Sequence, residues 1–184
     1  MVSLLEAIFL GVLQGLTEWL PVSSSAHLAL AQYYLGVSVP VSFDIMLHVG
    51  TLFAVLAFYR KRLVGLAAKA LVKNSEEQKM VLLLALASIP TAILGLAFKD
   101  FFASMFLQPT AIAIALLITG VWLYLASSCS PRTGEKDVST KSAFAIGVAQ
   151  GIAVAPGISR SGATIGAALF LGVERKKAAE FSFL

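Results

Sequence analysis

The sequence predicts an all-α integral membrane protein, arranged as an inverted repeat with at least three transmembrane helices and two re-entrant helical hairpins. Of its 184 residues, 58% are hydrophobic and only 13% are charged, and the mean hydropathy is +0.87. A soluble domain carries about 25% charged residues, so this chain has too few to cover a water-soluble globule. The same hydrophobic content excludes intrinsic disorder. Two further observations support this fold class. Some apolar runs have membrane-spanning length, and two long, interrupted runs are similar to each other.

The distribution of charge separates a membrane protein from a nucleic-acid binder. The net charge of +4 alone would suit either class. The lysines and arginines, however, fall in short runs between apolar stretches, which is the pattern of a multi-pass membrane protein. We therefore expect no nucleic-acid partner. The single cysteine, Cys129, excludes an internal disulfide and a cysteine-built metal site.

Three apolar stretches have the length of about 20 residues that a bilayer-spanning helix needs. They are Val41–Tyr59, Met80–Phe98 and Pro109–Ala126. Pro90 interrupts the second stretch, but neighbouring helices and water can satisfy the carbonyl that a proline leaves free in a transmembrane helix. Residues 43–126 are therefore predicted to form three transmembrane helices.

Two further apolar stretches, residues 1–42 and 142–173, are each too long for one span and are interrupted in the middle. Pro21–Ser25 breaks the first and Pro156–Gly162 breaks the second. Prolines, glycines and serines end one helix and cap the next. Each stretch is therefore predicted to be a re-entrant hairpin, called here the first and the second hairpin. Irregular backbone at this depth is stable only when it is buried in protein or lines a wet cavity.

The basic residues predict which loops face the cytoplasm. Arg60–Lys79 holds six Lys or Arg and Lys99–Gln108 holds one, whereas Ser127–Lys141 and Arg175–Lys177 hold three each. Because cytoplasmic loops are enriched in Lys and Arg, we expect the loop with one to lie outside and the other three inside. The second hairpin must then enter the membrane from the cytoplasmic side and the first from the outside.

The two hairpins are related by an internal repeat. Shifted by 136 positions, residues 11–37 match residues 147–173 at ten positions, including a Gly-Val-x-Gln-Gly string and a Ser-x-Ser pair. The three predicted spans between the copies invert the second copy, and paired discontinuous helices of such repeats bracket a binding site. By the same offset the repeat would continue past Leu184. We therefore interpret residues 1–184 as one C-terminally incomplete membrane domain in which residues 174–184 open the next helix.

The middle of the first hairpin gathers polar side chains inside an apolar run. They are Gln14, Glu18, Ser23, Ser24, Ser25 and His27. Gln14 and Glu18 are four residues apart and share one helix face, where their oxygens suit Mg²⁺ or Ca²⁺. A carboxylate and an imidazole are costly inside a membrane unless they are paired or hydrated. The cluster is therefore either a reactive site or a polar plug that stabilises the packing of the hairpin.

The middle of the second hairpin offers an anion site. Ser159 and Ser161 flank Arg160, and Gly157 and Gly162 allow close approach of the backbone. A helix that begins here points free N–H groups at the turn, and the guanidinium fork of Arg160 suits phosphate oxygens. Alternatively, Arg160 pairs with the glutamate of the first hairpin only to neutralise two buried charges.

An anion site inside a membrane suits a phosphorylated lipid. The sequence contains no nucleotide-binding fingerprint. A serine or His27 could attack phosphorus while a carboxylate or an imidazole carries the proton. Arg160, backbone amides and a metal would stabilise the charge on the transferred phosphoryl group. These residues predict a phosphate-lipid site that supports hydrolysis, and the alternatives are an inverted-repeat transporter or flippase of a phosphorylated lipid and a structural membrane subunit.

At these motifs the sequence resembles the undecaprenyl-diphosphatase family, also called bacitracin-resistance proteins. Gln14–Glu18 resembles the family's (Glu/Gln)-x-x-x-Glu motif, Pro21–His27 its Pro-x-Ser-Ser-x-x-His element, and Pro156–Gly162 its Pro-Gly-x-Ser-Arg-Ser-Gly motif. The resemblance implies a multi-pass plasma-membrane phosphatase that hydrolyses a polyprenyl diphosphate to the monophosphate and so recycles the lipid carrier for cell-wall glycan synthesis. It also implies re-entrant hairpins in inverted repeats and a homodimer.

The resemblance also implies roles for individual residues. The implied catalytic residues are Glu18, His27, Arg160 and Ser24, the implied substrate-binding residues are Ser23, Ser25, Gly157, Ser159 and Ser161, and the implied ligands of a divalent metal, Mg²⁺ or Ca²⁺, are Gln14 and Glu18. Ser24 is the candidate nucleophile and His27 the alternative. Gln14 stands where the motif also allows Glu, which removes one charge from the metal site.

Other residues in the apolar stretches have simpler explanations. Asp44 and His48 are four residues apart on a helix and can pair with each other. Trp122 suits packing or the membrane interface. Gly147 and Gly151 form a small-residue face that allows close contact between helices.

Overall fold

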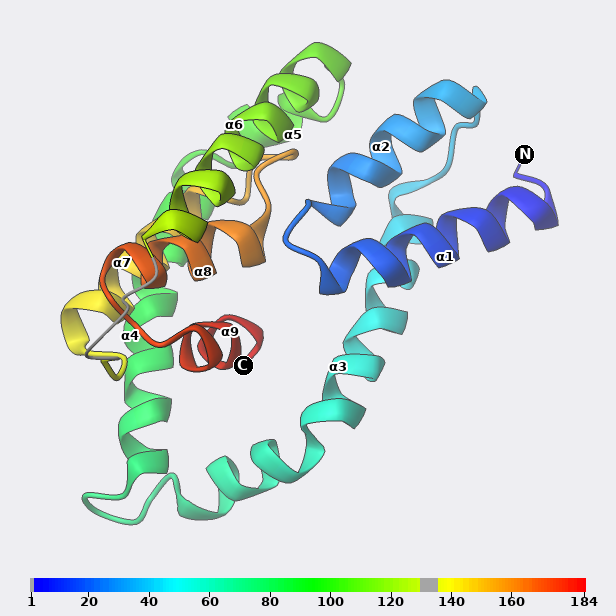
Figure 1. The fold of residues 1–184 in the computed structure, drawn as a ribbon. Helices are drawn as coiled ribbons and strands as arrows, with labels where there is room; N and C mark the ends of the chain where they lie inside the picture. The colour runs from blue at the N-terminus through cyan, green and yellow to red at the C-terminus, as the bar shows by residue number, and fades with distance from the viewer. Residues whose placement is uncertain (1, 130–135) are drawn as a thin grey trace.

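The computed structural model describes residues 2–129 and 136–184, and this part of the chain is helical (Figure 1). Its helices are α1 (Leu4–Trp19), α2 (Ser24–Leu35), α3 (Val41–Lys69), α4 (Glu76–Ala97), α5 (Lys99–Met105), α6 (Pro109–Ser128), α7 (Thr140–Ile152), α8 (Arg160–Phe170) and α9 (Arg175–Phe183). The predicted all-α fold is confirmed for the described residues. Residues 130–135 of the predicted cytoplasmic loop Ser127–Lys141 lie outside them.

Three of these helices, α3, α4 and α6, are long and apolar enough to cross a membrane. They correspond to the predicted spans Val41–Tyr59, Met80–Phe98 and Pro109–Ala126, and Pro90 lies inside α4 as predicted. α3 continues ten residues beyond its predicted end, to Lys69. Basic side chains can extend to water at the end of a spanning helix, and their charge interacts favourably with the negative end of the helix dipole.

Apolar side chains cover the outside of the molecule. Leu5 of α1, Phe53 of α3 and Leu117 of α6 are 79%, 67% and 71% exposed. Exposing apolar surface to water costs about 25 cal/mol per Å², whereas the same surface is stable against lipid tails. This surface supports the assignment as an integral membrane protein.

Both predicted interruptions of helix are present. A short non-helical turn separates α1 from α2, and another separates α7 from α8. α1 begins at Leu4 and α7 at Thr140, while α2 begins at Ser24 and α8 at Arg160, so each pair of helices is offset by 136 residues. This is the offset of the sequence repeat. The entry of the two hairpins into the membrane from opposite sides stays a prediction.

The second hairpin packs tightly against α4. A Cβ at Gly147 would lie 2.1 Å from the carbonyl oxygen of Ala87, and one at Gly151 would lie 2.7 Å from Leu94 Cδ1. The hydroxyl of Thr91 in α4 lies 2.9 Å from the carbonyl oxygen of Gly147. Around these contacts is a buried apolar cluster that includes Ala87, Ala143, Ile146, Ala168 and Phe181. The predicted close contact at Gly147 and Gly151 is confirmed, and it fixes the second hairpin in a packed frame.

The first hairpin packs against α3 and touches α6. In Figure 1 it lies beside the group formed by α4 to α9, and the turn between α1 and α2 points toward α8. Leu10 of α1 and Ala26 of α2 are fully buried. The two hairpins therefore approach each other at their turns.

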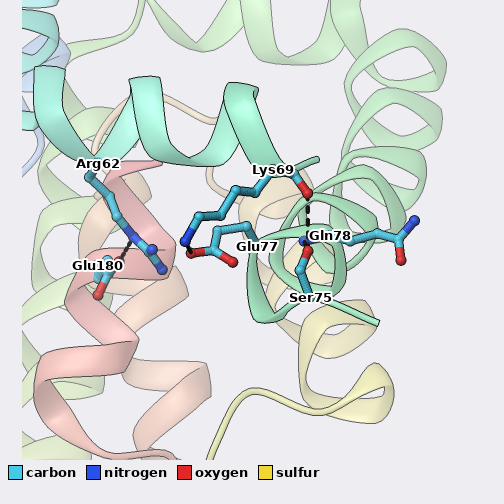
Figure 2. A network of polar contacts seen from close by, with 6 residues as sticks. All are labelled: Arg62, Lys69, Ser75, Glu77, Gln78 and Glu180. Carbon is cyan, nitrogen blue, oxygen red and sulfur yellow. Dashed lines mark hydrogen bonds and ion pairs between the residues drawn. The ribbon is translucent and has the colours of Figure 1, made fainter. Parts of the chain in front are cut away.

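Polar contacts connect the C-terminal part of α3 to α4 and α9 (Figure 2). The Nε of Arg62 donates a 2.6 Å hydrogen bond to Glu180 of α9. Lys69 lies 3.5 Å from Glu77 of α4. The hydroxyl of Ser75 donates to the carbonyl of Lys69 and accepts from an amide in the first turn of α4, both at 3.0 Å. These contacts close the turn between α3 and α4 and join it to α9.

Candidate active site

The turns of the two hairpins, called here the first tip (residues 20–23) and the second tip (residues 153–159), meet directly. The amide of Gly157 donates a 3.2 Å hydrogen bond to the hydroxyl of Ser23, a residue 134 positions earlier. Close by, a Cβ at Gly162 would lie 3.2 Å from the carbonyl oxygen of Pro21. The turns of the two hairpins are therefore in direct contact, with Ser23 of one bonded to Gly157 of the other.

The first hairpin brings Glu18 and Ser24 together. The hydroxyl of Ser24 donates a 2.6 Å hydrogen bond to Oε2 of Glu18, and Nε2 of Gln14 donates to the same oxygen at 3.0 Å. Gln14 is only 1% exposed, and its Nε2 also lies 3.4 Å from the hydroxyl of Thr51 in α3. A hydroxyl bonded to a carboxylate is the arrangement of a nucleophile with its general base.

Ser23 leaves the N-terminus of α2 open. It has φ 65° and ψ 87°, a left-handed conformation that a residue other than glycine rarely adopts. Its hydroxyl is bonded to Gly157, and none of the described side chains caps α2. The first amides of a helix have no partner within the helix, and they form an anion site when no side chain caps them.

His27 lies one turn into α2 and is partly exposed. Its Nδ1 lies 2.8 Å from the carbonyl oxygen of Ser23. Because a carbonyl can only accept a hydrogen bond, this contact assigns a proton to Nδ1 and leaves Nε2 of a neutral ring as an acceptor. His27 can therefore take or give a proton, or attack, through Nε2.

The second tip presents a cation and a helix N-terminus. The hydroxyl of Ser159 accepts a 3.1 Å hydrogen bond from the amide of Gly162 and so caps α8, and Ser161 Oγ lies 3.4 Å from it. Arg160 is exposed, and its guanidinium has no hydrogen-bond or ion-pair partner among residues 2–129 and 136–184. The alternative that Arg160 only neutralises Glu18 is therefore wrong for the described structure. The guanidinium is available to an anionic ligand.

Comparison with known proteins identifies the family of this chain. The family described as "Bacitracin resistance protein BacA" matches residues 7–184. The chain belongs to this family. Among its relatives are proteins named undecaprenyl-diphosphatase from Desulforapulum autotrophicum (42% identical, covering 99% of this chain and 72% of the relative), Elusimicrobium minutum (45%, 97% and 70%) and Syntrophotalea carbinolica (46%, 99% and 72%).

Membership in the BacA family confirms the family resemblance inferred from the sequence. The chain spans about seven-tenths of the length of these relatives, and the turns of both hairpins lie within the residues that the family matches.

Gln14 and Glu18, the predicted ligands of a divalent metal, have side-chain oxygens that suit such an ion. Gln14 Oε1 is buried and has no hydrogen-bond partner in the described structure. With Glu18 and the hydroxyl of Ser24 it offers neutral and anionic oxygens, the donors that Mg²⁺ and Ca²⁺ prefer. The described residues contain no group of three or more His, Cys, Asp or Glu that could hold a metal ion. Two protein ligands match a Mg²⁺ held partly by substrate phosphates, and the metal stays a proposal.

The polar pair predicted in α3 is arranged differently from the expectation. The carboxylate of Asp44 accepts a 2.7 Å hydrogen bond from Gln32 of α2. His48 Nδ1 lies 2.8 Å from the backbone carbonyl of Asp44, not from its carboxylate. The side chains of Asp44 and His48 therefore do not pair with each other, because the amide of Gln32 reaches the carboxylate across the helix contact.

Two residues of α6, Thr119 and Trp122, hold the second tip and the start of α8. The sequence did not single out Thr119, and for Trp122 it predicted only packing or a place at the membrane interface. Thr119 is hydrogen bonded to Gly157 and Ser159. Trp122 Nε1 donates a 3.1 Å hydrogen bond to the carbonyl of Gly162. The only sequence signal for Thr119 is a hydroxyl in an apolar span, which many spanning helices carry without a site. The packing role assigned to Trp122 is confirmed, and its indole also binds the backbone of α8.

Proposed function

We propose that this chain hydrolyses undecaprenyl diphosphate to undecaprenyl monophosphate and inorganic phosphate. Relatives that match nearly the whole chain are named for this activity. The observation that carries the proposal is the 2.6 Å hydrogen bond from Ser24 to Glu18 in a hairpin whose Ser23 is bonded to the second tip, directly before Arg160, whose guanidinium has no polar partner among the described residues. The names of the relatives favour this reading over a transporter or a structural subunit.

The diphosphate headgroup would bind between the two tips. The uncapped N-terminus of α2 and the first amides of α8 supply N–H groups, and the fork of Arg160 matches two phosphate oxygens. The hydroxyls of Ser23, Ser25, Ser159 and Ser161, with the backbone of Gly157, would line the headgroup. The polyprenyl tail would lie along the apolar outer faces of the helices in the membrane.

Ser24 is the nucleophile that the geometry favours. Its oxygen attacks the terminal phosphorus and Glu18 takes its proton, while the bond from phosphorus to the bridging oxygen breaks and the lipid monophosphate leaves with that electron pair. Water then attacks the phosphoserine and His27 takes a proton from it, while Glu18 returns the proton that it holds to the oxygen of Ser24 as the bond from that oxygen to phosphorus breaks and phosphate is released. Arg160 and the helix amides stabilise the charge of the transferred group.

His27 is the second candidate nucleophile because its Nε2 is free to attack. Acid quenching separates the two, since a phosphoserine survives acid and a phosphohistidine does not. A labelled phosphoryl group that stays on the wild-type protein after acid quenching, and is absent from Ser24→Ala, supports Ser24 as the nucleophile. Label lost in acid and absent from His27→Ala would transfer the role to His27.

Gln14 and Glu18 would hold the divalent cation, Mg²⁺ or Ca²⁺. When bound, it would neutralise charge on the diphosphate and favour its approach to Ser24. We further propose that the protein is a homodimer of the plasma membrane and that its product returns as the lipid carrier for cell-wall glycan synthesis.

The function is tested by release of inorganic phosphate from undecaprenyl diphosphate by the detergent-purified chain. We expect turnover by the wild type and at least a roughly 100-fold loss in Ser24→Ala, because activated nucleophiles and acid–base groups each contribute about 10² to 10⁴ in rate. Ser104→Ala is the matched control, since Ser104 is an exposed serine of α5 whose hydroxyl donates to the carbonyl of Phe101 in the same helix. Wild-type protein that is folded but releases no phosphate would contradict the proposal.

A further inference from the structure

We infer that Thr119 of α6 is a positioning residue that sets the backbone of the second tip for the phosphatase reaction. This inference rests on the proposed function and adds a residue that lies in neither hairpin. Thr119 is 5% exposed and lies within an apolar membrane-spanning helix. It does not reach the reacting atoms in the proposed mechanism and acts through the residues that it holds.

The hydroxyl of Thr119 connects two backbone groups of the second tip. It donates a 2.8 Å hydrogen bond to the carbonyl of Gly157 and accepts a 3.2 Å hydrogen bond from the amide of Ser159. Both backbone groups belong to buried residues, so no water replaces the hydroxyl without rearrangement. A single hydroxyl therefore fixes the chain on both sides of Ile158.

The two residues held by Thr119 each connect to the other parts of the site. The amide of Gly157 donates to the hydroxyl of Ser23, which joins the two tips. The hydroxyl of Ser159 caps α8, whose first residue is Arg160. A shift of the backbone at these residues would therefore move both the contact between the tips and the start of the helix that carries the guanidinium.

The shape of α6 supports this placement. Gly157 has φ 98°, and a Cβ there would lie 2.6 Å from Ala115 Cβ and 2.7 Å from the carbonyl oxygen of Ile112. Ile112, Ala115, Thr119 and Trp122 recur at three- and four-residue spacing, so they form one stripe of the helix. The second tip lies along this stripe, and Thr119 contributes its hydroxyl between the close contact at Ala115 and the indole of Trp122.

Thr91 of α4 provides a matched control within the same hairpin. Its hydroxyl also lies on an apolar spanning helix and contacts a backbone carbonyl of the second hairpin, that of Gly147, at 2.9 Å. Gly147 lies in the middle of α7, away from the tip. Thr91→Val therefore removes the same type of contact from the same hairpin without freeing a group of the tip.

The first experiment compares kcat and KM for undecaprenyl diphosphate in Thr119→Val, Thr119→Ser and Thr91→Val. A misplacement of about 1 Å can cost about 100-fold in rate. We expect Thr119→Val to lower kcat/KM by about 10- to 100-fold, with kcat reduced, Thr119→Ser to recover most of it, and Thr91→Val to remain within about 3-fold of the wild type. Equal kcat/KM in Thr119→Val and Thr91→Val would overturn the inference.

The second experiment measures hydrogen–deuterium exchange of peptides covering residues 153–162 and does not depend on activity. Exchange there should increase in Thr119→Val, which frees the amide of Ser159, and stay unchanged in Thr91→Val. Unchanged exchange in Thr119→Val would overturn the inference even if activity falls. If the wild type releases no phosphate, the proposed function fails, whereas the exchange comparison still decides whether Thr119 holds the tip. If Thr119→Val does not fold, Thr119→Cys replaces it, because a thiol is a weaker donor and acceptor.

Discussion

Ser23 and Ser159 occupy equivalent positions of the internal repeat, 136 residues apart, but their hydroxyls make different hydrogen bonds. Ser159 has φ −66° and caps its own helix through the amide of Gly162 at 3.1 Å. Ser23 has φ 65°, leaves α2 without a side-chain cap, and instead accepts a hydrogen bond from Gly157 in the other hairpin. The internal repeat is therefore asymmetric at its centre: one serine completes a helix and the other joins the two hairpins.

This asymmetry predicts different effects of the same substitution. Ser159→Ala should lower the free energy of unfolding by about 1 kcal/mol, the usual value of a helix cap. Ser23→Ala removes no cap and should mainly increase amide exchange at Gly157 and lower phosphate release. Thermal unfolding and exchange of the two purified variants test this. Equal exchange at Gly157 in both variants would contradict the prediction.

Arg160→Lys should lower kcat/KM by about 10- to 100-fold or more, because an ammonium cannot replace the two-pronged contact of a guanidinium with phosphate oxygens. The guanidinium makes no contact with the described residues that would stabilise the fold, so the unfolding temperature should not change. Phosphate release and thermal unfolding are measured on the same sample. Wild-type turnover in the variant would count against a phosphate-binding role.

Gln14→Glu should strengthen the binding of a divalent cation and destabilise the metal-free protein. The substitution replaces the amide that donates to Glu18 at 3.0 Å by a second carboxylate, so two like charges repel unless a cation lies between them. We expect the unfolding temperature of the variant to rise more steeply with Mg²⁺ or Ca²⁺ than that of the wild type, and chelation to reduce activity in both. A variant insensitive to either cation would argue against the metal site.

Gly157→Ala should destabilise the protein by about 1 to 3 kcal/mol, because φ is 98° and a Cβ would overlap Ala115 and Ile112. Gly65→Ala is the control: Gly65 lies inside α3 with open space at its Cβ, so the substitution should stabilise by up to about 1 kcal/mol. Denaturation of both variants in detergent gives the comparison. If both changes have the same sign and size, the close contact at the second tip is not as described.

The ion pair of Asp137 with Lys177 predicts a small pH dependence outside the spanning helices. The hydrogen bond and charge of Lys177 lower the pKa of Asp137, and Asp137 with Glu174 raises the pKa of Lys177. The pair therefore stabilises above the unfolded carboxylate pKa of about 4 and loses this effect as pH falls below it, or as pH rises beyond about 10. The unfolding temperature of Asp137→Asn should lie below that of the wild type at pH 7, and the difference should shrink as pH falls through the lowered pKa of Asp137. A difference that does not depend on pH would contradict this assignment.

Much of the fold follows from local patterns. The apolar length of Pro109–Ala126 is enough to predict α6, and the broken runs at Pro21–Ser25 and Pro156–Gly162 are enough to predict that a helix ends at each. The continuation of α3 to Lys69 was not predicted, because hydropathy marks where apolar residues end and not where backbone hydrogen bonding ends. The predicted pairing of Asp44 with His48 was also wrong, because the carboxylate of Asp44 binds Gln32, which comes from another helix.

Part of the candidate site also follows from the sequence, and the rest depends on the tertiary structure. The spacing of Gln14 and Glu18 places them on one helix face from sequence alone. The bond from Ser24 to Glu18 depends on the angle of the turn between α1 and α2, and the isolation of Arg160 depends on how α8 is oriented. A sequence pattern predicts neither the angle of this turn nor the orientation of α8.

The sequence by itself determined the class of protein, the spanning helices, the repeat and the polar residues of both tips, because each of these is written in composition, length or spacing along the chain. Tertiary structure alone decided that the amide of Gly157 binds Ser23, that Arg160 remains unpaired among the described residues, and that Thr119 of a third helix holds the second tip. Contacts between residues far apart in the chain depend on helix packing, which is set by the shapes of many side chains together.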